Sequence, residues 1–366
     1  MTDQRAIPTV YMRGGTSKGL LFNKKDLPSE KQKLAKYLLS AMGSPDIRQI
    51  DGMGGATSVT SKVCIISKSS KENIDIDYFF AQVLVDEARV DYGPTCGNML
   101  SAVGPFAIEQ GLIEAKEGKT EVTIRSVNTG SIIQATIQTP NKKVKYSGDY
   151  KIAGVPGEGS PILLKFKNLV GGVTGKLLPT GNKISIIKGI EVTCLDVSMP
   201  IVMAKASDFG IVGNETSDFL NQNKSLLKKI EEIRLIAALD MGMGDVSGQV
   251  IPKFALLSKP LNGGTITSRY FTPNTCHETH AATGTNCIAA ACLISNTVAS
   301  KIANIKASGN DKITIEHPLG LIDCLVETSS KVINFDKSFI KSCGIFRTSR
   351  KIMDGNVYIP ENIDND

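Results

Sequence analysis

The sequence predicts an α+β protein of two pseudo-equivalent, β-rich halves, each folded around one central helix. Most segments are short apolar runs bounded by glycine or polar residues, which is typical of strands. Two longer stretches, residues 97–111 and 284–298, are apolar almost all round, which is typical of a buried helix. One such stretch lies in each half, and each follows a glycine-bearing polar turn. This arrangement indicates a pseudo-repeat, although the two halves share little direct sequence identity.

The expected strands are clearest in the first half: VCIISK at 63–68, DYFFAQVLV at 77–85, TEVTIRSV at 120–127 and SIIQATIQT at 131–139. The stretch 217–238 has amphipathic helical spacing and is expected on the outside. The polar turn at 179–183 is the expected boundary between an N-terminal domain, 1–182, and a C-terminal domain, 183–366. The final strand can return to the first domain.

Composition limits the classes of function. The 366 residues are enough for about two domains, at roughly 150 residues each. No apolar run reaches the ~18 residues of a membrane span, and the N-terminal residues lack the apolar core of a signal peptide, so a cytoplasmic protein is expected. The lysines are scattered, aromatic residues are 5% and tryptophan is absent, which disfavours nucleic-acid binding. The modest net charge of +6 suits a small anionic substrate.

Cysteine and histidine patterns give no sign of a metal site. None of the 8 cysteines forms a CxxC pair, and without a secretory signal they are expected to be free thiols. His277 and His280 have helical spacing, but no acidic or thiolate partners at matching metal-ligand spacing stand out. No metal and no cofactor are therefore expected.

The stretch YMRGGTSKG, residues 11–19, gathers three glycines, an arginine, a lysine and two hydroxyl groups between two apolar runs. Glycines allow a sharp turn and close approach of the backbone to a ligand. A phosphate-binding loop is not indicated, because short strands and not a helix flank this stretch. GGVTGKLLPTG at 171–181 also fails as such a loop, since Val170 and Leu177 occupy positions that require glycine and a hydroxyl residue.

The starts of the two buried helices are the other candidate sites. A helix N-terminus offers unpaired backbone N–H groups and a partial positive charge, so it binds carboxylates or phosphates. Cys96 stands at the start of the first helix, where a thiolate would be stabilised. Gly97 permits close approach of a ligand, and Asn98 can cap the helix and donate a hydrogen bond. The alternative is that Cys96 is a small buried apolar residue.

Five motifs in order resemble the PrpF-type 2-methylaconitate cis-trans isomerases, a family that includes aconitate Δ-isomerases and 4-oxalomesaconate tautomerases. The motifs are YMRGGTSKGLLF (11–22), DGMGGATSVTSKV (51–63), YGPTCGNMLSAVGPFA (92–107), GGVTGKLLPTG (171–181) and HAATGTNCIAAA (280–291). The resemblance implies the diaminopimelate epimerase-like fold, with two similar domains, each a β-rich barrel around a central helix, and an active site between them. The implied reaction moves a double bond in an unsaturated polycarboxylate without a redox cofactor or metal.

The resemblance also implies roles for individual residues. Lys62, in the motif TSKV, is implied as an acid–base group whose direction of proton transfer stays open, and Cys96 is the natural second proton carrier. Arg13, Ser17 and Lys18 are implied to cradle a di- or tricarboxylate, with Gly14, Gly15 and Gly19 turning the loop and bringing its N–H groups to the ligand. A plain surface hairpin is the alternative for this loop.

In the second half, epimerases of this fold carry a second catalytic cysteine where this chain has Thr283, and Cys287 lies one turn further, where packing inside the helix is expected. Thr283, Gly284 and Thr285 are better suited to bind a carboxylate. His280 matches a family histidine that can donate to a carboxylate, and a structural histidine is the equal alternative. Leu319 replaces a serine that the family more often has, which leaves the substrate open.

Among possible substrates, 2-methylaconitate is the first expectation, with 4-oxalomesaconate tautomerisation or trans-aconitate isomerisation as alternatives. Two other classes remain open: an amino-acid racemase or epimerase, which Thr283 argues against, and a non-catalytic polycarboxylate binder, which the presence of Lys62 and Cys96 argues against. A small carboxylate is the expected partner, with no nucleic acid and no membrane. A homodimer is common for such folds, but the sequence does not decide it.

Overall fold

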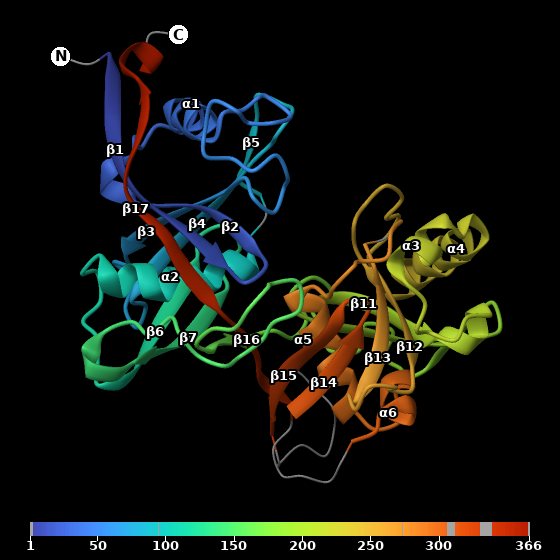
Figure 1. The fold of residues 1–366 in the computed structure, drawn as a ribbon. Coiled ribbons are helices and arrows are strands. Elements are labelled where there is room, and N and C mark those ends of the chain that lie inside the picture. The colour runs from blue at the N-terminus through green and yellow to red at the C-terminus, as the bar shows by residue number, and fades with distance from the viewer. Residues whose placement is uncertain (1–2, 94, 273, 306–311, 330–338, 365–366) are drawn as a thin grey trace. The chain divides into compact units, whose positions relative to one another are not determined.

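The computed structural model describes residues 3–93, 95–272, 274–305, 312–329 and 339–364. It divides into two compact units (Figure 1). Unit 1 comprises residues 1–164 and 346–366, and unit 2 comprises residues 165–345. The chain passes from one unit to the other inside strand β8 (Ile162–Lys167) and returns inside strand β16 (Ile340–Arg347).

The described residues of unit 1 form strands, two α-helices and short 3₁₀ turns. Its strands are β1 (Gln4–Gly14), β2 (Ser17–Asn23), β3 (Lys62–Lys68), β4 (Ile76–Val83), β5 (Val90–Asp91), β6 (Gly118–Ser126), β7 (Ile132–Thr139) and β17 (Ser349–Pro360). Its helices are α1 (Lys31–Met42) and α2 (Gly97–Glu109), with short 3₁₀ turns η1 (Lys24–Asp26), η2 (Pro140–Lys142) and η4 (Glu361–Asp364). The four strands expected in this half are confirmed as β3, β4, β6 and β7.

Unit 2 repeats this plan. Its strands are β9 (Ser185–Ile187), β10 (Ile190–Val197), β11 (Met199–Lys205), β12 (Lys253–Ser258), β13 (Ile266–Phe271), β14 (Lys312–His317) and β15 (Gly320–Thr328). Its helices are α3 (Ser217–Gln222), α4 (Lys224–Asp240), α5 (Ala282–Leu293) and α6 (Val298–Ile302), with the 3₁₀ turn η3 (Ala206–Phe209).

The strand pairings confirm the predicted pseudo-repeat. In unit 1, β1 is antiparallel to β2, β2 is parallel to β3, β3 is antiparallel to β4, β4 is parallel to β6, and β6 is antiparallel to β7. In unit 2, the series β10, β11, β12, β13, β14 and β15 shows the same alternation of antiparallel and parallel pairs. Each strand of the first series therefore has a counterpart in the second.

Each unit encloses one central helix, as the apolar stretches predict. Helix α2 contacts β1, β2, β3, β4, β7 and β17, and α5 contacts β10, β11, β14 and β15 (Figure 1). Every residue of α2 from 99 to 107 is buried, and so is every residue of α5 from 284 to 292. A helix that is surrounded by strands has no solvent-facing side, so its sequence carries no polar stripe.

Two predicted helices differ in their limits. Helix α5 begins at Ala282 and ends at Leu293, so Thr283 and Gly284 lie inside its first turn rather than before it. The helix expected at 217–238 is two helices, α3 and α4, because Asn223 has a non-helical ψ of 81° and its side chain accepts a hydrogen bond from the N–H of Leu226. Asparagine at such a position starts a new helix.

The division between units lies elsewhere than the expected boundary after residue 182. Residues 165–182 belong to unit 2, and residues 346–366 return to unit 1. The physical reason is a set of hydrogen bonds to β10: Asp196 Oδ2 accepts from the N–H groups of Val173 (3.0 Å) and Thr174 (2.8 Å), and the N–H of Asp196 donates to the carbonyl of Leu177 (3.1 Å). These bonds hold the glycine-rich segment 171–181 against unit 2.

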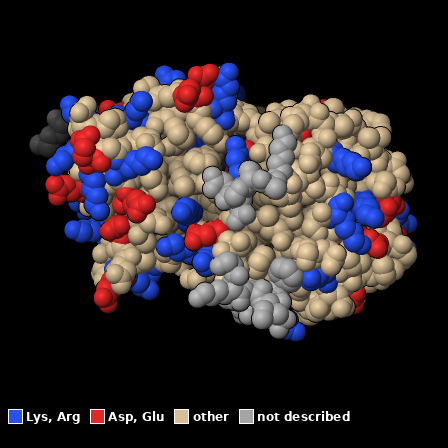
Figure 2. Space-filling model, turned by 90° about the horizontal axis from the view of Figure 1, so that it is seen from below, with Lys and Arg blue, Asp and Glu red and all other residues tan. Residues whose placement is uncertain are grey.

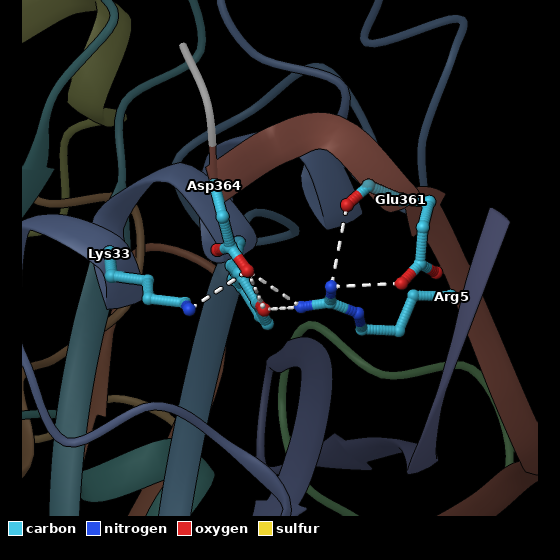
Figure 3. A network of polar contacts seen from close by, with 5 residues as sticks. Arg5, Lys33, Glu361 and Asp364 are labelled. Atoms are coloured by element: carbon cyan, nitrogen blue, oxygen red, sulfur yellow. Dashed lines mark hydrogen bonds and ion pairs between the residues drawn. The ribbon is translucent and has the colours of Figure 1, made fainter. Parts of the chain in front are cut away.

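The chain termini of unit 1 are held together by charged side chains (Figure 3). Arg5 on β1 pairs with Asp364 (3.0 Å) and Glu361 (3.1 Å) of η4, and Lys33 on α1 pairs with Asp364 (2.8 Å). Tyr37 joins the network through hydrogen bonds with Arg5 and Asp364. The ammonium of Lys33 is the main cause that lowers the pKa of Asp364. The network fastens β1, α1 and the C-terminal turn to one another.

Charged side chains of both signs are interspersed on the face drawn in Figure 2. The net charge of +6 is therefore not gathered into one continuous basic band on that face. Among the helices in the described residues, none combines the length and the apolar character needed to cross a membrane.

Candidate active site

The opening stretch forms the hairpin between β1 and β2, in which Gly14 pairs with Ser17. Its glycines are required by close packing. A Cβ at Gly14 would lie 2.7 Å from the carbonyl oxygen of Asn98, and a Cβ at Gly19 would lie 1.9 Å from the carbonyl oxygen of Lys62. The hairpin therefore touches the first turn of α2 at one point and the first residue of β3 at another, which brings the two predicted catalytic regions of unit 1 together.

Two backbone N–H groups of this loop have acceptors within the protein. The N–H of Gly15 donates to the carbonyl of Thr348, and the N–H of Lys18 donates to the carbonyl of Val59, both at 3.0 Å. Arg13 also bonds to the loop, since its Nη1 donates to the carbonyls of Gly15 (2.8 Å) and Thr348 (3.0 Å). These groups have protein partners because the hairpin packs on Thr348, which follows β16, and on Val59, which precedes β3, so these bonds fix the loop.

The three side chains predicted to cradle a carboxylate have different surroundings. Burial, and next the nearby Arg350, lower the pKa of the Arg13 guanidinium. Ser17 is buried, and the Lys18 ammonium lies 5.7 Å from the centre of the Tyr11 ring. Their roles in binding substrate stay predictions.

Lys62 is the first residue of β3 and is only 9% exposed. Its Nζ lies 2.7 Å from Oε1 of Gln82, its cross-strand partner, and 5.2 Å from the centre of the Phe80 ring. Within the described part of the chain, no carboxylate lies within ion-pair distance of this ammonium. An ammonium held out of water with only a neutral acceptor is suited to receive an anion or to transfer a proton.

Gln82 has a fixed orientation. Its Nε2 donates to the carbonyls of Ser61 (3.0 Å) and Ser58 (3.1 Å), so Oε1 is the atom turned toward Lys62. The sequence analysis did not identify Gln82. The only signal that could have found it is the antiparallel register of β3 and β4, which places Gln82 opposite Lys62.

Cys96 is the N-cap residue of α2 and is 9% exposed. Its carbonyl accepts hydrogen bonds from the N–H of Leu100 (3.1 Å) and the hydroxyl of Tyr78 (3.2 Å). The N–H groups of Gly97 and Asn98 find no acceptor in the residues that the structure describes. The positive end of α2 is therefore open to an anion, with a thiol at its edge. Pro94, which precedes this turn in the motif, lies outside the described residues.

Cys64 connects the two predicted catalytic residues. It lies two positions after Lys62 on β3 and is fully buried. Burial raises its pKa well above the ordinary value, and both Cys96 and Lys62 are near enough for their charges to act on it. Lys62 and Cys96 therefore belong to one neighbourhood of unit 1, while Cys64 itself is a packed thiol.

Asn98 ties the helix start to two residues that the sequence analysis did not identify. Its Nδ2 donates to Oγ1 of Thr16 (2.9 Å), and its Oδ1 accepts from Nε of Arg347 (3.1 Å). Arg347 lies at the end of β16 and is 7% exposed. No local motif marks it, because 249 residues separate the two partners in the chain.

In unit 2, the first turn of α5 holds Thr283, Gly284 and Thr285. The hydroxyl of Thr283 and the hydroxyl of Tyr270 both donate to Sδ of Met199, at 3.2 Å and 3.0 Å. Sulfur is a weak acceptor, so these two hydroxyls are available to a better one. A Cβ at Gly284 would lie 2.5 Å from the Tyr270 ring, which explains why glycine stands here.

Thr285 and His280 form a local structural pair. The hydroxyl of Thr285 donates to the carbonyl of Ala281 (3.0 Å) and lies 3.1 Å from Nδ1 of His280. Nε2 of His280 lies 3.2 Å from Oγ of Ser268, and its ring centre is 4.7 Å from that of Tyr270. Both ring nitrogens therefore have protein partners, which fits the structural alternative for His280.

Two further expectations concern unit 2. Cys287 is fully buried, its Sγ lies 3.5 Å from the carbonyl of Leu195, and burial raises its pKa, all of which fit the expected packing inside the helix. Leu319 lies in the turn between β14 and β15 and is 57% exposed. Its N–H donates to Nδ1 of His317 (3.3 Å).

The PrpF protein family model matches residues 4–360. The chain belongs to this family. It is 45% identical to 4-oxalomesaconate tautomerase of Pseudomonas putida over 356 residues, which cover 97% of both chains. It is 34% identical to 2-methyl-aconitate isomerase of Shewanella oneidensis, with 98% of both chains covered. The predicted membership is confirmed, and so is the prediction of an enzyme, since these relatives are isomerases and tautomerases.

Solved structures confirm the fold. A methylitaconate-delta-isomerase superposes with a TM-score of 0.91 at 36% identity, covering 99% of this chain and 97% of that one. A hydroxyproline epimerase superposes with a TM-score of 0.52 at 10% identity, covering 97% and 93%, and shows likeness of fold alone. The predicted epimerase-like α+β fold with two pseudo-equivalent domains is therefore correct.

Proposed function

We propose that this chain isomerises an unsaturated di- or tricarboxylate by allylic proton transfer, with an acid of the 4-oxalomesaconate type as the first candidate substrate. The observation that carries the proposal is the arrangement in unit 1. A nearly buried lysine with only a neutral amide acceptor, Lys62, belongs to the same neighbourhood as Cys96 and the open N-terminus of α2.

The reaction needs little beyond these groups. A base removes a proton from the carbon next to the double bond, and the electron pair of that C–H bond shifts the double bond by one position. An acid then returns a proton to the other end of the three-carbon unit, so the substrate keeps its atoms and its oxidation level. The open N–H groups of Gly97 and Asn98 are suited to hold the carboxylate on which negative charge develops.

Sequence identity reorders the candidate substrates. The motifs placed 2-methylaconitate first, but the chain is 45% identical to the oxalomesaconate tautomerase and 34% identical to the 2-methyl-aconitate isomerase. We therefore place the oxalomesaconate-type acid first and 2-methylaconitate second. Both share the reacting unit of a double bond beside carboxylates, so the same residues serve either one.

A substrate panel tests the proposal. The purified protein is incubated with 4-oxalomesaconate, 2-methylaconitate, 3-methylitaconate and trans-aconitate, and the double-bond shift is followed by ultraviolet absorbance and by proton NMR. We expect turnover of at least one acid, with the highest kcat/KM for 4-oxalomesaconate. Absence of any double-bond shift, together with exchange of the α-proton of a free amino acid in D₂O, would replace the proposal by racemisation.

A further inference from the structure

Lys62, Gln82 and Asp91 form one row across three neighbouring strands of unit 1. Lys62 on β3 pairs with Gln82 on β4, and Gln82 pairs with Asp91 on β5, both in antiparallel register. Side chains of residues paired in this way lie on the same face of a sheet. Gln82 therefore occupies the position between a lysine and an aspartate.

This face of the sheet is the one that meets the start of α2. Tyr78 lies four positions before Gln82 on β4, so the two side chains lie on the same face. The hydroxyl of Tyr78 donates to the carbonyl of Cys96, the N-cap residue of α2, at 3.2 Å. The row that contains Lys62 therefore faces the candidate active site, and strand register and one hydrogen bond, both within unit 1, establish this placement.

The amide of Gln82 can present only its oxygen to Lys62. Its Nε2 donates to the carbonyls of Ser61 (3.0 Å), Ser58 (3.1 Å) and Val83 (3.3 Å), and its Oε1 accepts from Nζ of Lys62 at 2.7 Å. A rotation of the amide by half a turn would place Oε1 against three carbonyl oxygens and Nε2 against another donor. The surrounding backbone therefore keeps a neutral acceptor aimed at the lysine nitrogen.

A neutral acceptor suits a group that gains and loses a proton. The ammonium form of lysine has three N–H donors, and the neutral amine keeps two of them beside its lone pair. Either form of Lys62 can leave one N–H on Oε1 of Gln82. In the amine form the lone pair then points away from Gln82, free to accept a proton. A carboxylate in the place of this amide would instead favour the ammonium form.

The titratable groups on the elements that pack around Lys62 include one carboxylate. They include Cys64 on β3, Lys18 on β2, Tyr78 on β4, Asp91 on β5 and Cys96 at the start of α2. Of these, Asp91 is the carboxylate, and its Oδ1 accepts from the N–H of Gly93 at 2.8 Å. The strand that carries Gln82 separates the backbones of Lys62 and Asp91 by two strand spacings, roughly 10 Å.

We propose that Gln82 is the positioning residue of Lys62, holding its nitrogen in one place in both the protonated and the neutral form. This inference rests on the proposed function, in which Lys62 carries the proton. Gln82 acts on the reaction through Lys62. Its replacement should therefore change kcat and the pH dependence of the rate, while the binding of a carboxylate changes little.

The variant Gln82→Met removes the acceptor and keeps most of the side-chain volume. Because the lysine nitrogen would lose its fixed position, we expect kcat to fall roughly ten- to hundredfold. We expect KM to stay within about twofold of wild type, as for an interaction that acts only in the transition state. The Kd of tricarballylate, a saturated tricarboxylate that has no double bond to shift, should stay equally close in calorimetry.

The variant Gln82→Glu keeps an oxygen near Lys62 but adds a negative charge. We expect the limb of the kcat/KM pH profile that reports Lys62 to move upward by about one pH unit or more. The direction is the same whether Lys62 acts as base or as acid, because the charge favours the ammonium in either case. The second carboxylate oxygen faces the carbonyls of Ser58 and Ser61, so the melting temperature should fall, and rates are measured well below it.

An NMR titration reads the same effect without turnover. Lysine labelled with carbon-13 at Cε reports the protonation of each side chain, and the Lys62 signal is the one missing in Lys62→Ala. We expect its midpoint to rise in Gln82→Glu and not to rise in Gln82→Met. The matched control is Gln134→Met, which removes a glutamine of β7 whose Nε2 donates to Glu121 at 2.9 Å. This control should keep the wild-type kcat, pH profile and Lys62 midpoint.

The possible results separate the positioning role from the proposed function. Wild-type kcat in Gln82→Met, or an unchanged Lys62 midpoint in folded Gln82→Glu, would overturn the role of Gln82 while turnover by the wild type upholds the isomerase. A lower melting temperature with normal kcat and pH profile in both variants would reduce Gln82 to a structural residue. If the wild type turns over no acid of the panel, the proposed function fails, and the Lys62 titration alone decides whether Gln82 controls this lysine.

Discussion

The two central helices begin differently although the units around them are built alike. Helix α2 in unit 1 begins after a thiol, Cys96, and near an ammonium, Lys62. Helix α5 in unit 2 begins after Ala281 and carries the hydroxyl of Thr283 in its first turn. The N-cap position therefore holds an ionisable thiol in unit 1 and an alanine in unit 2.

The ionisable groups of unit 2 mostly have structural partners. His280 contacts Ser268, Ala281 and Thr285, and Cys287 packs inside α5. Glu316 accepts hydrogen bonds from several backbone N–H groups. We infer that proton transfer depends on unit 1, whereas unit 2 contributes binding groups. Each of the following predictions tests one side of this comparison.

The largest effect is expected for Lys62→Ala. Removing the group that carries the proton should lower kcat by roughly 10²–10⁴-fold, while the fold is retained. The measurement is the initial rate with the best acid of the panel, together with the circular dichroism spectrum and the melting temperature. The matched control is Lys68→Ala at the other, exposed end of β3, which should keep wild-type kcat. A Lys62→Ala variant that keeps more than about a tenth of wild-type kcat would contradict the inference that Lys62 carries the proton.

The second prediction concerns the thiol at the start of α2. Cys96→Ser keeps the volume and hydrogen bonding of the side chain but replaces the thiol by a much weaker acid, so we expect a large loss of kcat with little change in the Kd of tricarballylate. The control is Cys287→Ser in α5, which should lower stability, because it buries a hydroxyl, but leave kcat of the folded enzyme unchanged.

Solvent exchange gives an independent measure for Cys96. In D₂O, two proton carriers introduce deuterium from solvent into the product, whereas a single shielded base can return the original proton. We expect deuterium in the product of the wild-type enzyme. Full retention of the substrate hydrogen, or normal kcat in Cys96→Ser, would leave Lys62 as the only proton carrier.

The third prediction tests whether a buried carboxylate of unit 2 is structural. Glu316 is 3% exposed. Its Oε1 accepts hydrogen bonds from the N–H groups of Asn262 (2.6 Å) and Gly264 (2.9 Å). Its Oε2 accepts hydrogen bonds from the N–H of Leu261 and the hydroxyl of Thr267, both at 2.9 Å. Burial alone would raise its pKa, but the hydrogen bonds together lower it. Glu316→Gln places an amide N–H₂ against these donors, so we expect a loss of about 2 kcal/mol or more in the free energy of unfolding at pH 7.

The pH dependence of this loss has a definite sign. A carboxyl group with a lowered pKa in the folded state stabilises the fold above its unfolded pKa of about 4.3, and this stabilisation disappears as the pH falls through the folded pKa. The difference between wild type and Glu316→Gln should therefore shrink below about pH 4 in urea unfolding. The exposed Glu232→Gln should shift the urea midpoint little at any pH. A constant difference from pH 7 to pH 3 would mean that the ionised form of Glu316 has no special role.

The sequence predicted the parts of this comparison that depend on local patterns. The apolar stretches at 97–111 and 284–298 identified both central helices, because a helix enclosed by strands must be apolar all round. Glycine and cysteine at the start of α2 marked one candidate site, because unpaired N–H groups make any helix N-terminus an anion site. The family motifs added Lys62, which no local pattern distinguishes from a surface lysine at the end of a strand.

The residues that the sequence did not reveal depend on long-range pairing. Gln82 meets Lys62 only because β3 and β4 pair in one register, and Arg347 meets Asn98 from the far end of the chain. The acceptors of two N–H groups in the loop 14–18, the carbonyls of Thr348 and Val59, also lie elsewhere in the sequence, so no local pattern reveals them.

The smallest effect is expected for Thr283→Val. The hydroxyl of Thr283 rests on a weak sulfur acceptor in the structure, so a substrate carboxylate would be its better partner. Loss of one such hydrogen bond costs about 1 kcal/mol, which predicts a rise in KM of roughly fivefold with kcat nearly unchanged. The matched control is Thr285→Val, two residues further along the same helix, whose hydroxyl already bonds to Ala281 and lies 3.1 Å from Nδ1 of His280. That control should lower the melting temperature and leave KM unchanged.

The informative contrary result is a tenfold or greater fall in kcat at unchanged KM in Thr283→Val, because the hydroxyl would then act in the proton transfer itself. In that case the first turn of α5 would take part in proton transfer together with Lys62 and Cys96. The starts of α2 and α5 would then differ in residue type but not in function.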